Sequence, residues 1–584
     1  MIRTRFRTAA STAAVAGSLV SLLSTAAPTH AQQADSFALH DGDRVVFYGD
    51  SITDQRQYTN FVEYYVVTRF PTMNVRFTHS GWGGDRVGGG GGGPIDLRLQ
   101  RDVLPYKPTV MTIMLGMNDA SYRAFDQGIF DTYTRGYTHI LNTVKKALPD
   151  VRFTLIQPSP YDDVTRAPGF PDGYNSVLVR YGNWIKETAE KEHQRVADLN
   201  TSTVAMLTKA NATDSALAQK IIPDRVHPGP GGHLIMAAAL LKAWNAPALV
   251  SRVSVDAGKK TVGQADNAKV SGLTKTGDSI SWDQLDSALP MIVDPGDPVV
   301  ALAIKSSDVT ESLNQEPLKV TGLTPDKRYT LTIDGREVGD FTGAEWAQGI
   351  NLATLPTPMA QQAMQVLSLT RQHNDEHFRR WRELQVPYST HSPAVQQALP
   401  PLLAALDAEE EQTVLKQRAA AQPKSHRFEI GPALPPPAGV NLALNKPYEV
   451  SDPNRYNYGP GGLTDGSFSG EAPHTFATGD TDVFPKTATI NLGTTASINA
   501  VIVGMPAFGS TKTVEVSVST DGQKFTKVGS YVFSLRHEEK HTYRFAATNA
   551  RYIRLTYPDH YDEEVGYNRA FSFTSEVEVY AAKP

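Results

Sequence analysis

A serine, a histidine and an aspartate in this chain have neighbours that suit nucleophilic catalysis. Ser51 follows a short apolar run ending in Gly49-Asp50, and His227 follows Asp224 at a spacing of three residues. A serine hydroxyl is a good nucleophile only when a base takes its proton and a third group orients that base. We therefore expect Ser51 to be the nucleophile, His227 the base and Asp224 its orienting partner. The non-catalytic alternative for Asp224 is a helix-capping acid in a polar loop.

Two further segments offer hydrogen-bond donors for the oxyanion that develops during acyl transfer. In Gly81-Trp82-Gly83-Gly84-Asp85, a residue without a side chain lets a backbone N–H reach the substrate. Leu115-Gly116-Met117-Asn118-Asp119 ends an apolar run with a side-chain amide. The alternatives are a glycine turn and an Asn-Asp helix cap, and both are common.

These residues need elements that bring them together. From Arg44 to about Trp244, short apolar runs alternate with helical patterns, which predicts βαβ units and a parallel sheet covered on both faces. The expected strands are 45–48, 75–78, 110–115, 153–156 and 195–198, and the expected helices include 56–70, 129–147, 175–192 and 231–244. Ser51 would then lie at the carboxyl end of a strand, where open α/β sheets bind their ligands.

In chain order, Gly49-Asp50-Ser51, Gly84, Gly116-x-Asn118-Asp119 and Asp224-x-x-His227 resemble the SGNH (GDSL) hydrolase family. The resemblance covers about residues 43–244 and implies a flavodoxin-like three-layer αβα fold. It also implies an oxyanion hole formed by the N–H groups of Ser51 and Gly84 and the Asn118 amide, with no cofactor for catalysis. The second block departs from the family, because His79-Ser80-Gly81 stands where many members have Asn-x-Gly.

Composition narrows the classes of function. The chain has 584 residues, a formal net charge of −5, no cysteine and no clustered basic face, which argues against a nucleic-acid partner. Three arginines precede an apolar run from Ala13 to Leu23, and this pattern predicts a signal peptide over residues 1–31. No later run reaches the roughly 20 apolar residues of a membrane span. We expect a bacterial protein that is secreted or periplasmic, and the sequence does not indicate its oligomeric state.

Changes in the residue pattern along the chain predict its division into domains. The predicted parts are a hydrolase domain (40–249), a small β-rich domain (250–355), a helical segment (356–432), a proline-rich linker (433–440) and a β-sandwich (441–584). Thr357-Pro358 predicts a helix start, because threonine caps a helix and proline suits its first position. Short runs separated by turns such as Asp521-Gly522 favour the terminal sandwich.

The last 140 or so residues resemble the discoidin (F5/8 type C) family, which includes galactose-binding-like carbohydrate modules. The matching segments are 441–447, 463–466, 490–493, 517–522, 551–555 and 576–580. The resemblance implies a structural calcium near Asp465 and Glu576. A tryptophan common in the family after Asp-Gly is missing, and His474 and Phe476 are nearby instead. Sugar binding and a purely structural sandwich both remain open.

Several other patterns need interpretation. The six glycines from Gly88 to Gly93 predict either a mobile loop at the mouth of the site or a tolerated surface insertion. Gly277-Asp278-Ser279-Ile280 repeats the nucleophile tetrapeptide, but its polar flank predicts a hairpin turn. His537-Glu538-x-x-His541 lies among β runs and lacks the helix that a zinc motif needs. We expect His373 and His377, one helical turn apart, to be solvated or packed rather than metal-binding.

Together these patterns predict a secreted serine esterase that removes acetyl or other short acyl groups from a polysaccharide or oligosaccharide. Two alternatives stay open. One is a lipase or arylesterase acting on apolar acyl esters, and the other is a glycan-binding adhesin whose hydrolase domain is inactive.

Overall fold

The computed structural model describes residues 36–584 except 295, 457–460, 536, 563–567 and 583–584. The predicted signal peptide, residues 1–31, lies outside this range. Within it, no helix combines the length and the apolar character that crossing a membrane would require.

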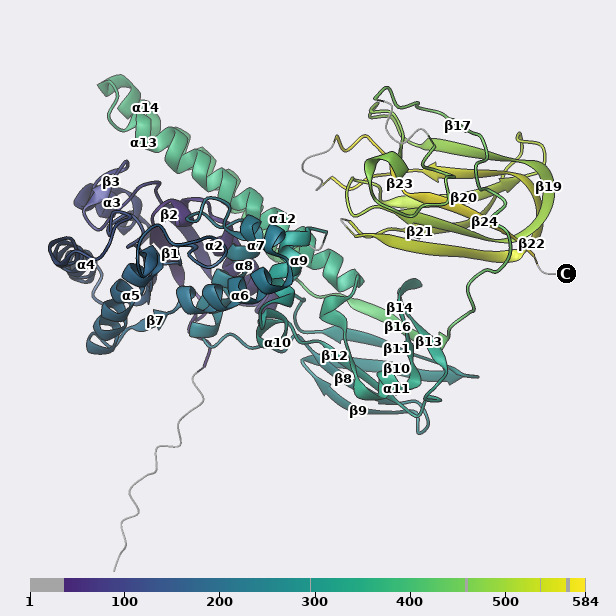
Figure 1. Ribbon diagram of the computed structural model, residues 1–584, viewed down its shortest axis with the longest axis horizontal. Coiled ribbons are helices and arrows are strands. Elements are labelled where there is room, and N and C mark those ends of the chain that lie inside the picture. Colours follow the sequence, from purple (N-terminus) through teal and green to yellow (C-terminus); the bar gives the residue numbers. More distant parts are fainter. Residues whose placement is uncertain (1–35, 295, 457–460, 536, 563–567, 583–584) are drawn as a thin grey trace, which may run out of the picture. The chain divides into compact units, whose positions relative to one another are not determined.

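A five-stranded parallel sheet forms the centre of the first part of the chain, and Figure 1 labels its strands β1, β2 and β7. The strand order of the sheet is β2-β1-β5-β6-β7. Its strands are β1 (Arg44–Gly49), β2 (Arg76–Gly81), β5 (Val110–Met114), β6 (Arg152–Ile156) and β7 (Arg195–Ala197). Counted along the chain, this order is 2-1-3-4-5, the flavodoxin-like arrangement. The predicted α/β fold class is confirmed, and all five expected strands are present.

Helices connect these strands. They are α1 (Ser51–Asp54), α2 (Gln57–Arg69), α3 (Ile95–Asp102), α4 (Gln127–Ala147), α5 (Gly173–Lys191), α6 (Leu199–Thr213), α7 (Ser215–Ile221) and α8 (Pro230–Ala243). Every residue of β5 is buried, as expected for a parallel strand with helices over both faces. Helix α2 is buried almost all round because α8 and a helix from the middle of the chain, α12 (Pro358–Phe378), both pack against it.

Within the run of six glycines, Gly92 is buried and closely packed, whereas Gly88 is exposed with open space where a Cβ would point. The two interpretations, a mobile loop at the mouth of the site and a tolerated surface insertion, both stay predictions. Strands β3 (Gly89–Gly90) and β4 (Gly93–Pro94) pair as a small antiparallel hairpin. A Cβ atom built on Gly92 would lie 2.5 Å from Cδ of Arg98 and 2.7 Å from the ring of Trp82. Glycine is needed here because neighbouring side chains occupy the space.

We expect Gly92→Ala to lower the free energy of unfolding by about 1–3 kcal/mol, the usual cost of overpacking a filled site. Gly88→Ala is the matched control, because a Cβ atom there meets nothing within 4 Å. Urea unfolding of both variants tests this difference. Equal midpoints for the two variants would contradict the close packing at Gly92.

The middle of the chain forms two sheets, ordered β15-β12-β8-β9 and β10-β11-β16-β13-β14. Their strands are β8 (Arg252–Asp256), β9 (Thr261–Asp266), β10 (Ala268–Thr276), β11 (Ser279–Asp286), β12 (Pro317–Thr321), β13 (Arg328–Ile333), β14 (Arg336–Thr342), β15 (Ile350–Asn351) and β16 (Ser425–Pro432). Strand β16 corrects the helical assignment of residues 356–432. Its alternating side chains bury His426, Phe428 and Ile430, so the chain returns from the helices into the sheet.

Helical elements interrupt and follow these sheets. They are α9 (Pro298–Lys305), α10 (Val309–Leu313), α11 (Gly343–Gln348), a 3-10 turn (Leu352–Thr354), α12, a π-helix η3 (Arg379–Gln385), α13 (Val386–Tyr388) and α14 (Pro393–Ala420). The predicted start of α12 is confirmed, because Thr357 caps the helix by accepting the Ala360 N–H and Pro358 occupies its first position. Helices α12 and α14 pack on each other, and α12 packs on α2.

One continuous hydrophobic core joins the parallel sheet to the middle region, from Ala38 to Ile430. The predicted boundaries at residues 249 and 355 therefore fall inside a shared core. The terminal part has its own core, which includes Ile490, Val501 and Ile553. Because the parallel sheet and the middle region share a core, side chains of the middle region can lie at the edge of that sheet.

The terminal part is an antiparallel β-sandwich, which confirms the prediction. Its larger sheet has the order β17-β19-β22-β20-β21, with β24 on β19, and β18 pairs with β23. The strands are β17 (Tyr448–Val450), β18 (Phe476–Ala477), β19 (Lys486–Met505), β20 (Thr513–Ser519), β21 (Thr526–Val532), β22 (Glu539–Tyr557), β23 (Phe573–Thr574) and β24 (Glu576–Ala581), with a 3-10 turn at Ala472–His474.

Candidate active site

Ser51 lies at the junction between a buried strand and a helix. Strand β1 ends at Gly49 and α1 begins at Ser51, with Asp50 as the cap that accepts the Ile52 N–H. A Cβ atom on Gly49 would come within 2.8 Å of the Met114 carbonyl oxygen, so the turn requires glycine. Ser51 therefore stands at the carboxyl end of the central sheet, as the sequence predicted.

The structure brings Ser51, His227 and Asp224 together. Nε2 of His227 is 2.7 Å from Oγ of Ser51, and Nδ1 of His227 is 2.6 Å from Oδ2 of Asp224. Oδ1 of Asp224 also accepts the N–H groups of Val226 and His227. Burial would raise the pKa of Asp224, but these hydrogen bonds outweigh it and hold the pKa below its ordinary value. An ionised Asp224 can keep the imidazole in the tautomer that accepts a proton from Ser51.

The segments predicted to supply oxyanion donors follow the two strands that flank β1. Gly49 pairs with Gly81 of β2 and with Met114 of β5, so Gly84 and Asn118 follow neighbouring strand ends. The Asn118 side chain donates through Nδ2 to the Asp85 carbonyl oxygen (3.1 Å) and accepts the Tyr122 hydroxyl at Oδ1 (3.0 Å).

Gly84 has the backbone that the predicted role needs. Its φ of +76° is in the left-handed region that favours glycine, and the space where a Cβ would point is open to 4 Å. The neighbouring Gly83 N–H donates to Asp54, which lies one helical turn after Ser51. A hydrogen bond thus connects the turn after β2 to the helix that begins at Ser51.

Sequence reasoning missed two buried carboxyl groups beneath this edge. Asp50 and Asp119 are 1% and 7% exposed, and burial raises the pKa of each to about 7, with the charge of Asp119 adding to the effect on Asp50. Asp119 accepts the Val87 N–H. Both residues stand in the quoted sequence blocks, but a one-dimensional pattern does not reveal their burial.

The π-helix of the middle region also contacts this edge. The Arg382 guanidinium lies 3.0 Å from the ring centre of Trp82, and its Nη2 is 3.8 Å from Oδ2 of Asp54. The neighbouring Trp381 donates from its indole N–H to Asp102 (2.7 Å). Single-turn π-helices recur at functional sites. Sequence reasoning missed this contact because nothing in the pattern pairs residue 382 with residue 82.

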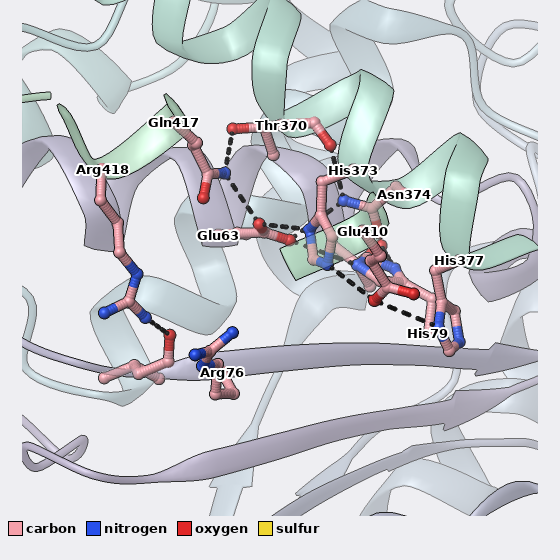
Figure 2. A network of polar contacts seen from close by, with 12 residues as sticks. Glu63, Arg76, His79, Thr370, His373, Asn374, His377, Glu410, Gln417 and Arg418 are labelled. Carbon is pink, nitrogen blue, oxygen red and sulfur yellow. Dashed lines mark hydrogen bonds and ion pairs between the residues drawn. The ribbon is translucent and has the colours of Figure 1, made fainter. Parts of the chain in front are cut away.

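His373 and His377 belong to a buried polar network between α2, α12 and α14 (Figure 2). His373 contacts Glu63 at 2.9 Å and Glu410 at 3.2 Å, and His377 is 3.6 Å from Glu410. The expected packing role is confirmed, whereas the solvated one is wrong. Among the residues that the structure describes, no group of three or more histidine, aspartate or glutamate residues could hold a metal ion.

Two other sequence patterns, around Ser279 and His541, have the local structure that was predicted. Gly277 and Asp278 form the turn between β10 and β11, so Ser279 begins a sheet strand. His541 lies in strand β22 with its ring stacked on Tyr531 at 3.7 Å, so this part of the chain lacks the helix of a zinc motif.

Two acidic groups mark the place where the family resemblance implies calcium. Burial raises the pKa of Glu576 to about 8, and the charge of Asp465 adds to the effect. Glu576 contacts the Asp465 side chain and accepts the Gly466 N–H at Oε2 (2.9 Å), and Asp465 accepts a bond from His474 at 2.8 Å. Two close carboxyl groups fit either a shared proton or a cation. Calcium at Asp465 and Glu576 stays a prediction.

The geometry around Ser51 defines a class of protein. A serine bonded to a histidine, itself bonded to a carboxylate, at the strand-order reversal of a flavodoxin-like sheet is the constellation of hydrolases that act through a serine nucleophile. Residues 47–235 match the GDSL-like lipase/acylhydrolase family, and residues 462–555 match the NedA-like, galactose-binding domain. Both resemblances seen in the sequence are confirmed.

The known proteins that are similar to this chain include an esterase and a solved enzyme structure. An acetylxylan esterase of Geobacillus stearothermophilus is 26% identical over 220 residues, which cover 34% of this chain and 93% of that protein. The solved structure of a gut microbial diltiazem-metabolizing enzyme has a TM-score of 0.59 and 26% identity, covering 68% of this chain and 99% of that chain.

Proposed function

We propose that this protein is a secreted serine esterase that hydrolyses short-chain esters, chiefly acetyl esters, on a carbohydrate. The observation that carries the esterase activity is the hydrogen-bonded series Ser51–His227–Asp224, with distances of 2.7 and 2.6 Å. The family match over residues 47–235 supports the same class of reaction.

In this mechanism Oγ of Ser51 attacks the ester carbonyl carbon while Nε2 of His227 takes its proton. The N–H groups of Ser51 and Gly84 and the Asn118 amide stabilise the negative oxygen. His227 then returns the proton to the departing sugar hydroxyl, which leaves an acyl-enzyme. Water, deprotonated by His227, releases the acid and restores Ser51.

Three observations support a carbohydrate substrate. The similar Geobacillus protein is an acetylxylan esterase, the terminal domain matches a galactose-binding family, and the amino-terminal residues predict export. An exported esterase joined to a sugar-binding module would be held close to an insoluble, acetylated polysaccharide.

The test is acetate release from acetylated xylan, pectin and sialic acid, measured beside diltiazem and p-nitrophenyl esters of increasing chain length. We expect acetylated sugars and the acetyl p-nitrophenyl ester to be hydrolysed, with activity falling as the acyl chain lengthens. Ser51→Ala is the control for contaminating esterases. A strong preference for long acyl chains would instead support the lipase or arylesterase alternative. A protein that hydrolyses none of these esters but binds glycans would be the inactive adhesin.

A further inference from the structure

An aromatic cluster lies beside the proposed oxyanion hole. The ring of Tyr122 stacks on that of Tyr174, with centroids 5.0 Å apart and an interplanar angle of 28°. Tyr161 meets both rings edge-on, at 6.2 Å and 5.3 Å. Tyr174 is fully buried and donates to the Met117 carbonyl oxygen, whereas 44% of Tyr122 remains exposed. Tyr122 is therefore a solvent-facing ring on a rigid aromatic support.

The backbone holds Tyr122 in an uncommon conformation. Ser121 and Tyr122 have φ values of +59° and +54°, in the left-handed region that side chains disfavour. Such conformations cost free energy and persist where surrounding contacts fix them, often at functional sites. Here the contacts are the stack on Tyr174 and the hydroxyl bond to Asn118.

The Tyr122 hydroxyl fixes the orientation of the Asn118 amide. It donates to Oδ1 of Asn118 at 3.0 Å, while Nδ2 donates one hydrogen to the Asp85 carbonyl oxygen at 3.1 Å. An amide nitrogen carries two hydrogens, so the second stays available for an oxyanion. Without the phenol, the amide keeps only the bond to the Asp85 carbonyl oxygen and loses the second of the two bonds that fix its orientation.

Tyr122 also lies within electrostatic reach of the proposed catalytic groups. Burial raises the pKa of its hydroxyl to about 12, and the charges of Asp50 and Asp224 add to that effect. Tyr161, whose ring meets that of Tyr122 edge-on, has its ring centre 5.8 Å from the Arg225 guanidinium, and Arg225 follows Asp224 in the chain. Contacts thus connect the exposed ring both to Asn118 and to the loop that contains Asp224. A substrate held at Ser51 would approach this ring.

We propose that Tyr122 is a substrate-positioning residue, whose hydroxyl orients the Asn118 amide and whose exposed ring receives the apolar C–H face of the acetylated sugar. This inference rests on the proposed esterase function and specifies how its site recognises carbohydrate. An aromatic ring offers a large, rigid contact area, and its hydroxyl end stays bonded to a polar partner. Sugar binding and oxyanion stabilisation would therefore depend on the same side chain.

The experiment compares Tyr122→Phe with Tyr122→Asn on p-nitrophenyl acetate and on an acetylated xylo-oligosaccharide. We expect Tyr122→Phe to lower kcat about 10-fold on both substrates, as for the loss of one hydrogen bond, with KM for the oligosaccharide unchanged. Tyr122→Asn should lose as much kcat and also raise KM about 5- to 10-fold for the oligosaccharide alone. Asparagine tolerates positive φ, so this variant keeps the backbone conformation.

Tyr388→Phe is the matched control, because Tyr388 is similarly exposed, at 40%, but lies on α13. Circular dichroism checks that each variant is folded. Wild-type kcat in Tyr122→Phe, or an unchanged oligosaccharide KM in Tyr122→Asn, would overturn this inference while an inactive Ser51→Ala still supported the esterase. An active Ser51→Ala would instead overturn the proposed function itself.

Discussion

Ser51→Ala is expected to lower kcat for acetate release by about 10⁶-fold, the scale seen when a triad nucleophile is removed. The reason is that Ser51 Oγ, 2.7 Å from Nε2 of His227, is the one hydroxyl bonded to that imidazole among the residues that the structure describes. His227→Ala should cost about as much, and the double variant no more, because the residues act as one unit. Single-turnover measurements with p-nitrophenyl acetate test this by following the acyl-enzyme burst.

The chain contains its own matched control for this experiment. Ser279 stands in the same tetrapeptide, Gly-Asp-Ser-Ile, but begins a strand after a hairpin turn. Ser279→Ala should keep wild-type kcat and KM. Loss of activity in Ser279→Ala together with an active Ser51→Ala would show that the nucleophile had been assigned to the wrong serine.

Glu63→Ala is expected to destabilise the protein by about 3–5 kcal/mol, the usual cost of removing one member of a buried ionic network. Glu63 is 1% exposed and accepts bonds from His373 (2.9 Å), Asn374 (3.0 Å) and Gln417 (2.8 Å). Alanine would leave these donors without their acceptor inside the protein (Figure 2). Urea unfolding, together with hydrogen exchange in α12, measures the effect.

Glu411→Ala is the control for Glu63, since Glu411 joins α14 to strand β2 through an ion pair with Arg76. The side chains of that pair are 40% and 42% exposed, so its loss should cost no more than about 1 kcal/mol. Equal destabilisation by the two variants would contradict the importance of burial at Glu63.

The same network predicts how stability depends on pH. Burial lowers the pKa of His373, but the charges of Glu63 and Glu410 outweigh it and raise that pKa to about 10. Since the unfolded value is about 6.5, this stabilisation is complete below pH ~6.5 and is lost as the pH rises toward 10. The pKa values of both glutamates are lowered despite burial, so their contribution is lost on acidification. The urea concentration at the unfolding midpoint should therefore decrease when the pH is raised above neutrality and also when it is lowered below neutrality. Glu63→Gln should shift the decrease at alkaline pH to lower pH.

Local patterns were enough to predict the elements that carry the site. The apolar run before Gly49 and the Gly-x-Asn-Asp after β5 predicted strand ends, and parallel pairing put those ends on one edge. The placement of Gly92 and Arg382 could not be predicted in this way. Their roles depend on packing between residues distant in sequence, such as Arg382 over Trp82, and no local propensity encodes such contacts.

The same limit explains the errors in the middle region. Residues 356–432 have mostly helical patterns, but Phe428 stacks on Trp282 at 5.4 Å, and that partner lies more than a hundred residues earlier. For the histidines of α12 the sequence left a solvated and a packed role open, because their acidic partners, Glu63 and Glu410, come from α2 and α14. Both the strand at the end of this segment and the burial of these histidines depend on contacts between residues that are distant in sequence.

The return of the chain through β16 has a consequence for how this enzyme can diversify. Strands β14 and β16 lie on either side of β13, so the excursion from residue 343 to residue 424 begins and ends in one sheet. That excursion carries Arg382 to Trp82, whereas Ser51, Asp224 and His227 all belong to the parallel-sheet part. Substitutions in the excursion can therefore change what packs on Trp82 and Asp54 while the sheet that precedes Ser51 stays constant. The position of Ser51 and the contacts made to Trp82 are in this sense encoded by separable stretches of one chain.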